Sequence, residues 1–133
     1  MNAQENTKIA RQAYEYFNSG NIESLLGLYT DDAQWETPEV KNIPQSGKRS
    51  GLAGIREFMS LVNEDLEALK FEPREFIAQD DKVVITGDYR WRVKATGKEY
   101  ASDWVHVCTF KNGKVTSFKE YLDTAAARDA HTA

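Results

Sequence analysis

Apolar residues recur at helical spacing through the first part of the chain. The run that predicts the first helix consists of Ile9, Ala10, Ala13, Tyr14 and Phe17. Gly20 is a typical residue to end such a helix, and Asn21 can cap a second, shorter one. The apolar face of that second helix would hold Ile22, Leu25, Leu26 and Tyr29.

A short strand, a loop and a third helix are predicted next. Residues 33–37 favour a strand that Pro38 ends. Prolines and glycines are frequent from residue 38 to residue 51, so we expect a loop there, lying over an opening. A third helix is predicted for residues 52–65, and its buried stripe would be Ile55, Phe58, Met59, Val62 and Leu66.

From residue 69 the apolar period changes to two, which is typical of strands. In residues 83–93 the side chains predicted to share the inner face are Ile85, Tyr89, Trp91 and Val93, and those predicted to face outward are Asp88, Arg90 and Arg92. Gly87 interrupts the inner face and suggests a bend or a bulge. A two-residue turn at Thr96 and Gly97 would pair this strand with residues 99–110.

That turn fixes a register that can be checked. It sets Lys94 opposite Glu99 and Arg90 opposite Asp103, which are two charge-matched cross-strand pairs. On the inner face the same register sets Tyr89 opposite Trp104 and Gly87 opposite His106.

The turn at residues 111–114 allows two registers for the last strand. A two-residue Asn112–Gly113 loop would turn Ser117, Lys119 and Tyr121 inward. A three-residue loop with a bulge at Gly113 would turn Phe118, Glu120 and Leu122 inward instead. We favour the second, because it buries two apolar side chains and leaves Lys119 in water. Glu120 would then lie opposite Trp104 and diagonal to His106.

Length and composition bound the class of protein. A chain of 133 residues with 41% hydrophobic residues is expected to form one domain, residues 1–133. A net charge of −4 disfavours nucleic acid or an anionic membrane as a partner. No apolar run is long enough to span a membrane, and the polar start does not resemble a signal peptide. One cysteine, Cys108, excludes an internal disulfide, so we expect a cytoplasmic protein without a metal cluster.

The order of elements and several short motifs resemble the nuclear transport factor 2-like superfamily, and within it the SnoaL-like and ketosteroid-isomerase-like proteins. The motifs are residues 17–21 (FNSGN), 28–33 (LYTDDA), 35–38 (WETP), 50–58 (SGLAGIREF), 110–115 (FKNGKV) and 120–125 (EYLDTA). The resemblance implies an α+β fold in which three N-terminal helices pack in a strongly curved mixed or antiparallel sheet, a cone-like barrel with an internal pocket. The superfamily carries isomerases, cyclases, dehydratases, hydrolases and pure binders, so its fold alone does not decide the activity.

At the positions that the resemblance matches to the catalytic groups of ketosteroid isomerases, this chain carries different residues. The position of that family's general base, before the proline of the first strand, is Thr37 here. The position of its oxyanion-hole tyrosine matches Ala13, and that of its second, protonated aspartic acid donor matches His106. Steroid isomerisation by the usual mechanism is therefore not expected.

The residues that remain for acid–base chemistry are His106 and Glu120. A buried imidazole needs a hydrogen-bonding partner, and a structural histidine bonded to a neighbour is one interpretation of His106. In the other, Glu120 orients the ring and raises its basicity, which leaves the second ring nitrogen free for a ligand. Glu120 is simply solvated if the two-residue loop holds. The second histidine, His131, is expected in a frayed tail.

The predicted pocket wall consists of Trp35, Thr37, Phe58, Tyr89, Trp91, Trp104, Phe118 and Leu122. Aromatic residues at alternating strand positions are also typical of a plain core. Two functions stay open. The first is acid–base catalysis, without a cofactor, on a small hydrophobic substrate. The second is a non-catalytic role, as a module that binds such a molecule or as an adaptor.

The outer sheet face is expected to be partly apolar, with Val84, Thr86, Val105, Val107 and Thr109 on it. An uncovered apolar face of this kind predicts a homodimer that pairs through the backs of the two sheets.

Overall fold

The structure is a computed structural model that describes residues 2–133. Its elements are α1 (Ala3–Ser19), α2 (Ile22–Leu26), β1 (Tyr29–Thr37), β2 (Gly47–Ser50), α3 (Gly51–Asp65), β3 (Leu66–Gln79), β4 (Lys82–Val93), β5 (Glu99–Lys111), β6 (Lys114–Leu122) and α4 (Thr124–Ala130). The six strands form one sheet in the order β2-β1-β6-β5-β4-β3. The β1–β6 pair is parallel and the other pairs are antiparallel, so the sheet is mixed. The predicted α+β class with a curved mixed sheet is confirmed.

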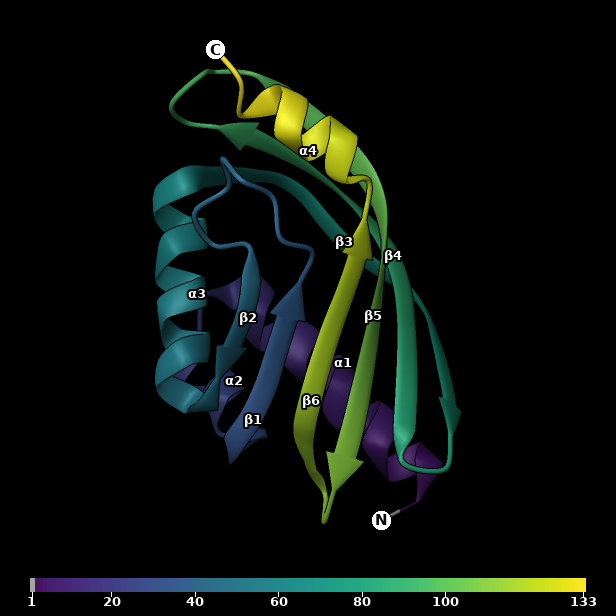
Figure 1. Ribbon diagram of the computed structural model, residues 1–133. Coiled ribbons are helices and arrows are strands. Elements are labelled where there is room, and N and C mark those ends of the chain that lie inside the picture. The colour runs from purple at the N-terminus through teal and green to yellow at the C-terminus, as the bar shows by residue number, and fades with distance from the viewer. Residues whose placement is uncertain (1) are drawn as a thin grey trace.

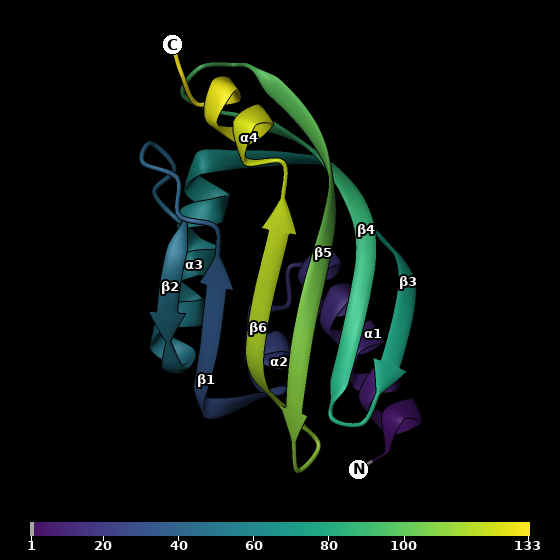
Figure 2. The same cartoon turned by 45° about the vertical axis from the view of Figure 1, so that its right-hand side comes forward.

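The long strands β3, β4 and β5 bend along their length, and α1, α2 and α3 lie on one side of the sheet (Figures 1 and 2). The helix α4 follows β6 and crosses one end of the molecule (Figure 1). The core fills the space between the helices and the concave face of the sheet. Its most deeply buried large side chains include Trp104, Ile55 and Ile85. A long curved sheet with helices on one face therefore encloses an interior between them.

Side-chain caps and a left-handed glycine mark several helix boundaries, and Gly20 and Asn21 were predicted from the sequence. The Asn2 side chain accepts the backbone N–H of Glu5, and Gly20 ends α1 with a left-handed φ of 75°. Asn21 caps α2 through the N–H of Ser24, and Asp123 caps α4 through that of Ala126. Each of these side-chain caps bonds to a residue three positions away, so they depend on the local sequence.

Two predictions about the segment between α2 and α3 were wrong. The first strand begins at Tyr29, four residues before the expected start, because α2 ends at Leu26 and only a two-residue turn separates it from the strand. The stretch predicted as a loop contains the short strand β2, in which Gly47 pairs with Thr37. The Thr37 hydroxyl accepts the N–H of Gly47 at 3.2 Å and holds β2 against β1. Pairing with the preceding strand β1 thus made a strand of a sequence rich in turn residues.

The register predicted for the β4–β5 hairpin was wrong by two residues. Arg92, not Lys94, lies opposite Glu99, and Tyr89 lies opposite Ser102. The predicted two-residue turn is in fact a five-residue loop, residues 94–98, in which the N–H of Gly97 bonds back to the Val93 carbonyl. The predicted inner and outer faces of β4 and β5 are still correct, because a shift of two residues leaves every side chain on the same side of the sheet.

The shift places Gly87 opposite Trp104, and this neighbour explains why a glycine is needed at position 87. A Cβ built on Gly87 would lie 2.3 Å from the Trp104 ring and 2.4 Å from the Glu72 carbonyl oxygen. The register of β4 on β5 is unbroken here. The irregularity that the sequence suggested lies on the neighbouring strand β3, between Pro73 and Glu75. Gly87 therefore makes room for an indole.

The β5–β6 hairpin combines parts of both predicted alternatives. Its loop is the two-residue one, with left-handed φ angles of 51° at Asn112 and 80° at Gly113. A register shift beyond Thr109, where Phe110 pairs with Val115, then turns Phe118 inward, as the favoured alternative predicted. Glu120 lies directly opposite His106 rather than diagonal to it.

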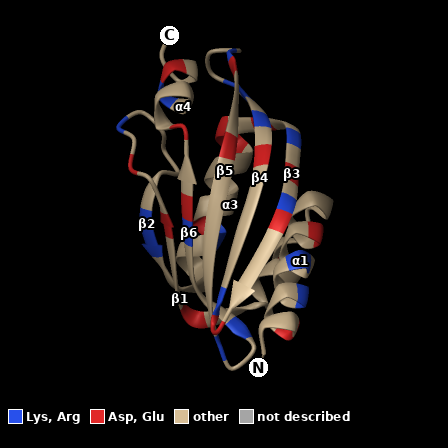
Figure 3. Cartoon of the chain, turned by 90° about the vertical axis from the view of Figure 1, so that its right-hand side faces the viewer, with Lys and Arg blue, Asp and Glu red and all other residues tan. Residues whose placement is uncertain are grey.

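The outer face of the sheet carries a set of ion pairs across β3, β4 and β5 (Figure 3). The Asp88 carboxylate lies 2.9 Å from the Lys70 ammonium and 2.8 Å from the Arg74 guanidinium, and Arg92 contacts Glu67 at 2.8 Å. The valines and threonines predicted on this face are partly buried. Within residues 2–133, no helix is both long and apolar enough to cross a membrane.

The contact between Gly87 and Trp104 predicts a large cost for Gly87→Ala. We expect a loss of about 2–4 kcal/mol in the free energy of unfolding, because backbone and indole must both move to admit the methyl group. Urea denaturation measures it. Gly27→Ala is the control, since Gly27 has an ordinary right-handed φ of −63° and should change stability by less than about 1 kcal/mol. Equal effects of the two substitutions would contradict the packing role of Gly87.

Candidate functional site

A cavity of about 120 Å³ lies between the helices and the inner face of the sheet. Apolar cavities of roughly 150 Å³ accept a benzene molecule, so this space suits a ligand of about one ring. Its wall is formed by the four helices, by β1, β3, β4, β5 and β6, and by the segment of residues 38–46. Neither lysine nor arginine is among the wall residues, and Glu120 is the one carboxylate among them.

The structure brings most of the predicted wall residues to this cavity. Seven of the eight line it: Trp35, Thr37, Phe58, Tyr89, Trp91, Phe118 and Leu122. Trp104 does not. It is 1% exposed and lies behind His106, with the two ring centroids 4.0 Å apart and the planes nearly parallel. The two-residue error in the hairpin register explains the difference, because Trp104 sits over Gly87 instead of over Tyr89.

The polar centre of the cavity is His106, with both ring nitrogens bonded. Its Nε2 lies 2.7 Å from a Glu120 carboxylate oxygen, and its Nδ1 lies 2.7 Å from the Tyr14 hydroxyl. His106 is 3% exposed, and the Glu120 side chain is 14% exposed. The imidazole therefore connects α1 to β6 across β5. The expectation that one ring nitrogen would be free for a ligand was wrong, because Tyr14 occupies it.

The chemistry of the partners assigns the protons on this chain of groups. A carboxylate only accepts, so Nε2 carries a hydrogen and donates it to Glu120. Nδ1 then either accepts the phenolic hydrogen of Tyr14, with a neutral ring, or donates to the phenol, with a cationic one. In the first state the hydroxyl hydrogen points at Nδ1, so it can pass to the ring when the Tyr14 oxygen takes up another proton.

Burial keeps the phenols of this site protonated. It raises the pKa of Tyr14 well above 10, and the Glu120 carboxylate adds to the rise. Burial also raises the pKa of Tyr89, with the Glu120 carboxylate adding to the rise. Both side chains thus act as hydrogen-bond donors near neutral pH. Burial raises the pKa of the Cys108 thiol to about 12, which makes it a neutral core residue rather than a nucleophile.

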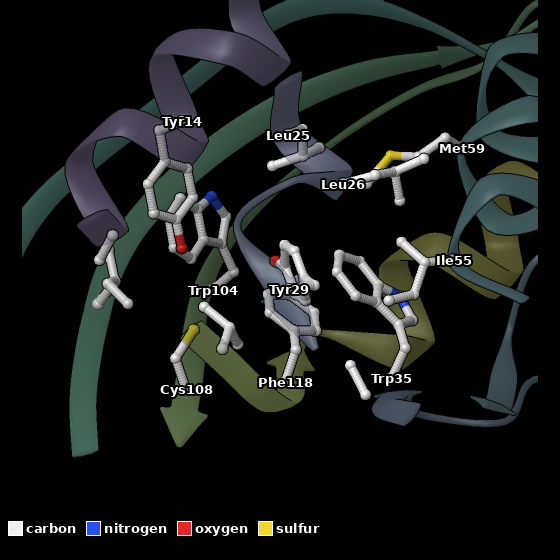
Figure 4. Packing of buried hydrophobic residues seen from close by; sticks show 14 of the residues in the cluster. Tyr14, Leu25, Leu26, Tyr29, Trp35, Ile55, Met59, Trp104, Cys108 and Phe118 are labelled. Carbon is white, nitrogen blue, oxygen red and sulfur yellow. The ribbon is translucent and has the colours of Figure 1, made fainter. Parts of the chain in front are cut away.

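Aromatic rings hold the site in place. The Tyr14 ring stacks on His106 at a centroid distance of 5.9 Å and on Trp104 at 5.7 Å. On the other side of the cavity Trp35 stacks on Phe118 at 3.8 Å. Figure 4 shows Tyr14 reaching from α1 toward the sheet beside Trp104, and Phe118 beside Tyr29 and Trp35. These contacts fix the rotamers of the two aromatic groups that face the ligand space.

The sequence analysis missed Tyr14 as a polar residue. It counted Tyr14 in the apolar stripe of the first helix, where its ring does belong, and matched the family's tyrosine to Ala13. A signal existed, since a tyrosine on a buried helical face needs a partner for its hydroxyl. His131 was placed wrongly in a frayed tail. It is bonded to Asp65 at 2.6 Å with a side chain only 3% exposed.

Other predicted features lie away from the cavity. Arg90 and Arg92 face outward and pair with Glu99. Across residues 2–133, no three histidine, cysteine, aspartate or glutamate side chains converge in a way that would hold a metal ion.

Comparisons with known proteins decide the family. The model of the SnoaL-like domain matches residues 10–118. The chain belongs to the SnoaL-like family. The fold of this SnoaL-like chain is similar to that of an NTF2-like protein from Burkholderia xenovorans, with a TM-score of 0.90 and 32% identity over 99% of both chains. No curated protein matches the sequence.

Two further solved structures are similar to this SnoaL-like chain. An NTF2-like protein of unknown function from Burkholderia pseudomallei has a TM-score of 0.89 and 26% identity over 97% of this chain and 98% of that one. TerC, co-crystallised with polyporic acid, has a TM-score of 0.83 and 30% identity over 96% of this chain and 98% of that one. The NTF2-like cone is therefore shown for this chain.

The bond from Tyr14 to His106 predicts a specific effect of Tyr14→Phe. Loss of the hydroxyl leaves buried Nδ1 without a partner, so stability should fall by about 1–3 kcal/mol. The nitrogen chemical shifts of His106 should change with it. Tyr16→Phe on the same helix is the control, because no partner of the Tyr16 hydroxyl is found among residues 2–133. Unchanged His106 shifts in Tyr14→Phe would show that the bond does not form.

Proposed function

We propose that this SnoaL-like protein binds a small, uncharged, largely aromatic molecule in the cavity and transfers a proton on it through Tyr14, His106 and Glu120. The observation that carries the proposal is the fully bonded, buried chain of these three groups at the wall of an apolar cavity. A wall without lysine or arginine disfavours a carboxylate or phosphate ligand, because such a charge would be desolvated without a counter-ion.

In this proposal the atom that meets the ligand is the Tyr14 oxygen. As a base, Tyr14 takes a proton from the ligand while its own proton passes to Nδ1 of His106, and Glu120 stabilises the imidazolium that forms. The reverse transfer returns the proton to another ligand atom. A free phenolate is avoided, which matters because burial raises the Tyr14 pKa. Tyr89, also a donor, would polarise a ligand oxygen.

The likeness to TerC supports the choice of a first probe. TerC was co-crystallised with polyporic acid, and it covers nearly the whole of this chain. Polyporic acid and single-ring ketones and phenols are therefore the molecules to screen. Because the cavity measures about 120 Å³, a ligand larger than one ring requires its wall to move.

A binding module that leaves its ligand unchanged is the second candidate function. Glu120→Gln separates the two, because glutamine keeps the shape and a hydrogen bond but cannot stabilise an imidazolium. For an enzyme we expect turnover to fall by about 100-fold or more, with probe affinity within a few-fold of the original. Glu75→Gln on the outer face is the control and should leave both unchanged. Retained turnover in Glu120→Gln would refute the proton relay, and binding without turnover in any variant would support the module.

We also propose that two copies pair through the outer sheet face. Tyr121 there is 49% exposed, and the neighbouring Val84, Val105 and Val107 are only partly buried. Joining two such faces would remove this apolar surface from water.

Sedimentation at micromolar concentration should find a dimer, and Val105→Glu should convert it to a monomer, because two carboxylates would meet apolar surface. Lys111→Glu at the hairpin end is the control for an added acidic residue. A monomer in the unaltered protein would contradict the proposal.

A further inference from the structure

The Glu120 carboxylate can accept more hydrogen bonds than His106 donates to it. One of its oxygens lies 2.7 Å from Nε2 of His106. The Glu120 side chain lines the cavity and is 14% exposed, whereas the His106 side chain is 4% exposed. A carboxylate offers about four acceptor sites, and His106 uses one of them. Because neither lysine nor arginine is among the described wall residues, acceptor capacity is left on the cavity wall.

The Tyr89 phenol is a donor close to this carboxylate. Tyr89 belongs to β4 and Glu120 to β6, and both line the cavity. The Tyr89 ring lies 6.3 Å from the Trp104 ring, which stacks on His106 at 4.0 Å. Burial raises the pKa of Tyr89, and the charge of the nearby Glu120 raises it further. Tyr89 is therefore protonated near neutral pH, and its hydroxyl hydrogen can turn toward Glu120 or toward a ligand.

These two groups together select among ligand oxygens and nitrogens. A ketone oxygen would take the Tyr89 hydrogen and bring none for Glu120, so two acceptors would face each other without a hydrogen between them. An ammonium would give a hydrogen to Glu120, but it has no lone pair to accept the Tyr89 hydrogen. A hydroxyl does both, because its oxygen accepts while its hydrogen is donated. The pair is therefore complementary to a hydroxyl group.

Other polar groups of the wall are bonded elsewhere. The Tyr14 hydroxyl meets Nδ1 of the imidazole at 2.7 Å. The Thr37 hydroxyl accepts a backbone N–H at 3.2 Å, and the Ser46 hydroxyl donates to a backbone carbonyl at 2.8 Å. The Gln45 amide donates to a carboxylate at the end of α3. None of these bonds uses the remaining acceptor capacity of Glu120.

We propose that Glu120 and Tyr89 form a hydroxyl-binding subsite, so that the ligand of this cavity is a phenol or an enol rather than a plain ketone or an ammonium. The ligand oxygen accepts from Tyr89, and the ligand hydrogen is donated to Glu120. Tyr14 bonds the other nitrogen of His106, so the proton that it transfers comes from a different atom of the ligand. The subsite rests on the proposed function for a one-ring ligand in the cavity, but it concerns binding and needs no turnover.

The first test compares phenol with toluene on the unaltered protein, by titration followed through the nitrogen NMR signals of His106. The two probes have nearly the same shape, and a plain apolar cavity would prefer toluene, because a hydroxyl loses its hydration on entry. We expect phenol to bind at least about 10-fold more tightly, because its hydrogen bonds to a charged acceptor. Toluene binding as tightly as phenol would overturn the subsite and leave the cavity as a ligand site. Failure of both probes to bind would refute the proposed function and the subsite with it.

The second test concerns the ligand hydrogen. Anisole keeps the phenol oxygen but has no hydrogen for Glu120, and ethylbenzene carries the same added methyl group relative to toluene. The ratio of phenol to anisole affinity should exceed the ratio of toluene to ethylbenzene affinity by at least about 10-fold. Equal ratios would show that Glu120 accepts no hydrogen from the ligand and would overturn the subsite.

The third test concerns the donor. Tyr89→Phe should lower the affinity for phenol by about 5- to 10-fold, the effect of one neutral hydrogen bond, and change that for toluene by less than about two-fold. Tyr16→Phe is the matched control, because Tyr16 is not among the wall residues, and it should leave both affinities unchanged. Equal losses of phenol and toluene binding in Tyr89→Phe would show a packing role alone and would overturn the donor assigned to Tyr89.

Discussion

The requirement to satisfy one buried imidazole links the parts of this structure. His106 is enclosed by aromatic rings, where an unpaired nitrogen would cost about 1–3 kcal/mol. Its two partners come from elements far apart in the chain, Tyr14 on α1 and Glu120 on β6. The helix must therefore pack at a height where its tyrosine meets β5, and β6 must pair in a register that turns Glu120 inward. The two hydrogen bonds that satisfy the buried nitrogens of His106 are the same bonds that connect Tyr14 to Glu120.

The register of β6 depends in turn on one irregularity. The Asn112–Gly113 loop by itself would send Glu120 to the outer face, and the shift beyond Thr109 reverses this. Phe118 then enters the interior and stacks on Trp35, so apolar burial and the position of the carboxylate favour the same register. Two aromatic groups and one acid occupy the cavity wall because the strand gains an extra residue at this point.

Membership of the SnoaL-like family accounts for the cone but not for this polar centre. The resemblance drawn from the sequence matches the base and the oxyanion donors of ketosteroid isomerases to Thr37, Ala13 and His106. Thr37 supports the pairing of β2, and Ala13 lines the cavity. The phenol that meets His106 comes from the residue after Ala13, on the same helical turn. The same fold can thus carry different polar residues in its cavity, as expected where the site rather than the fold determines the function.

The sequence by itself determined the first three helices and the inner and outer faces of β4 and β5, because caps and side-chain alternation are local signals. It favoured a position for Glu120 within reach of His106 but left two registers of β6 open, and the structure pairs the two residues directly. The sequence could not determine the hairpin register, since a slip of two residues keeps every face and only the fit of Trp104 against Gly87 excludes it. Nor could it place Tyr14 and His131, whose partners, His106 and Asp65, are 92 and 66 residues distant in the chain. A hydrogen bond over such a separation has no local pattern. Only the tertiary structure decides which polar groups meet around each histidine.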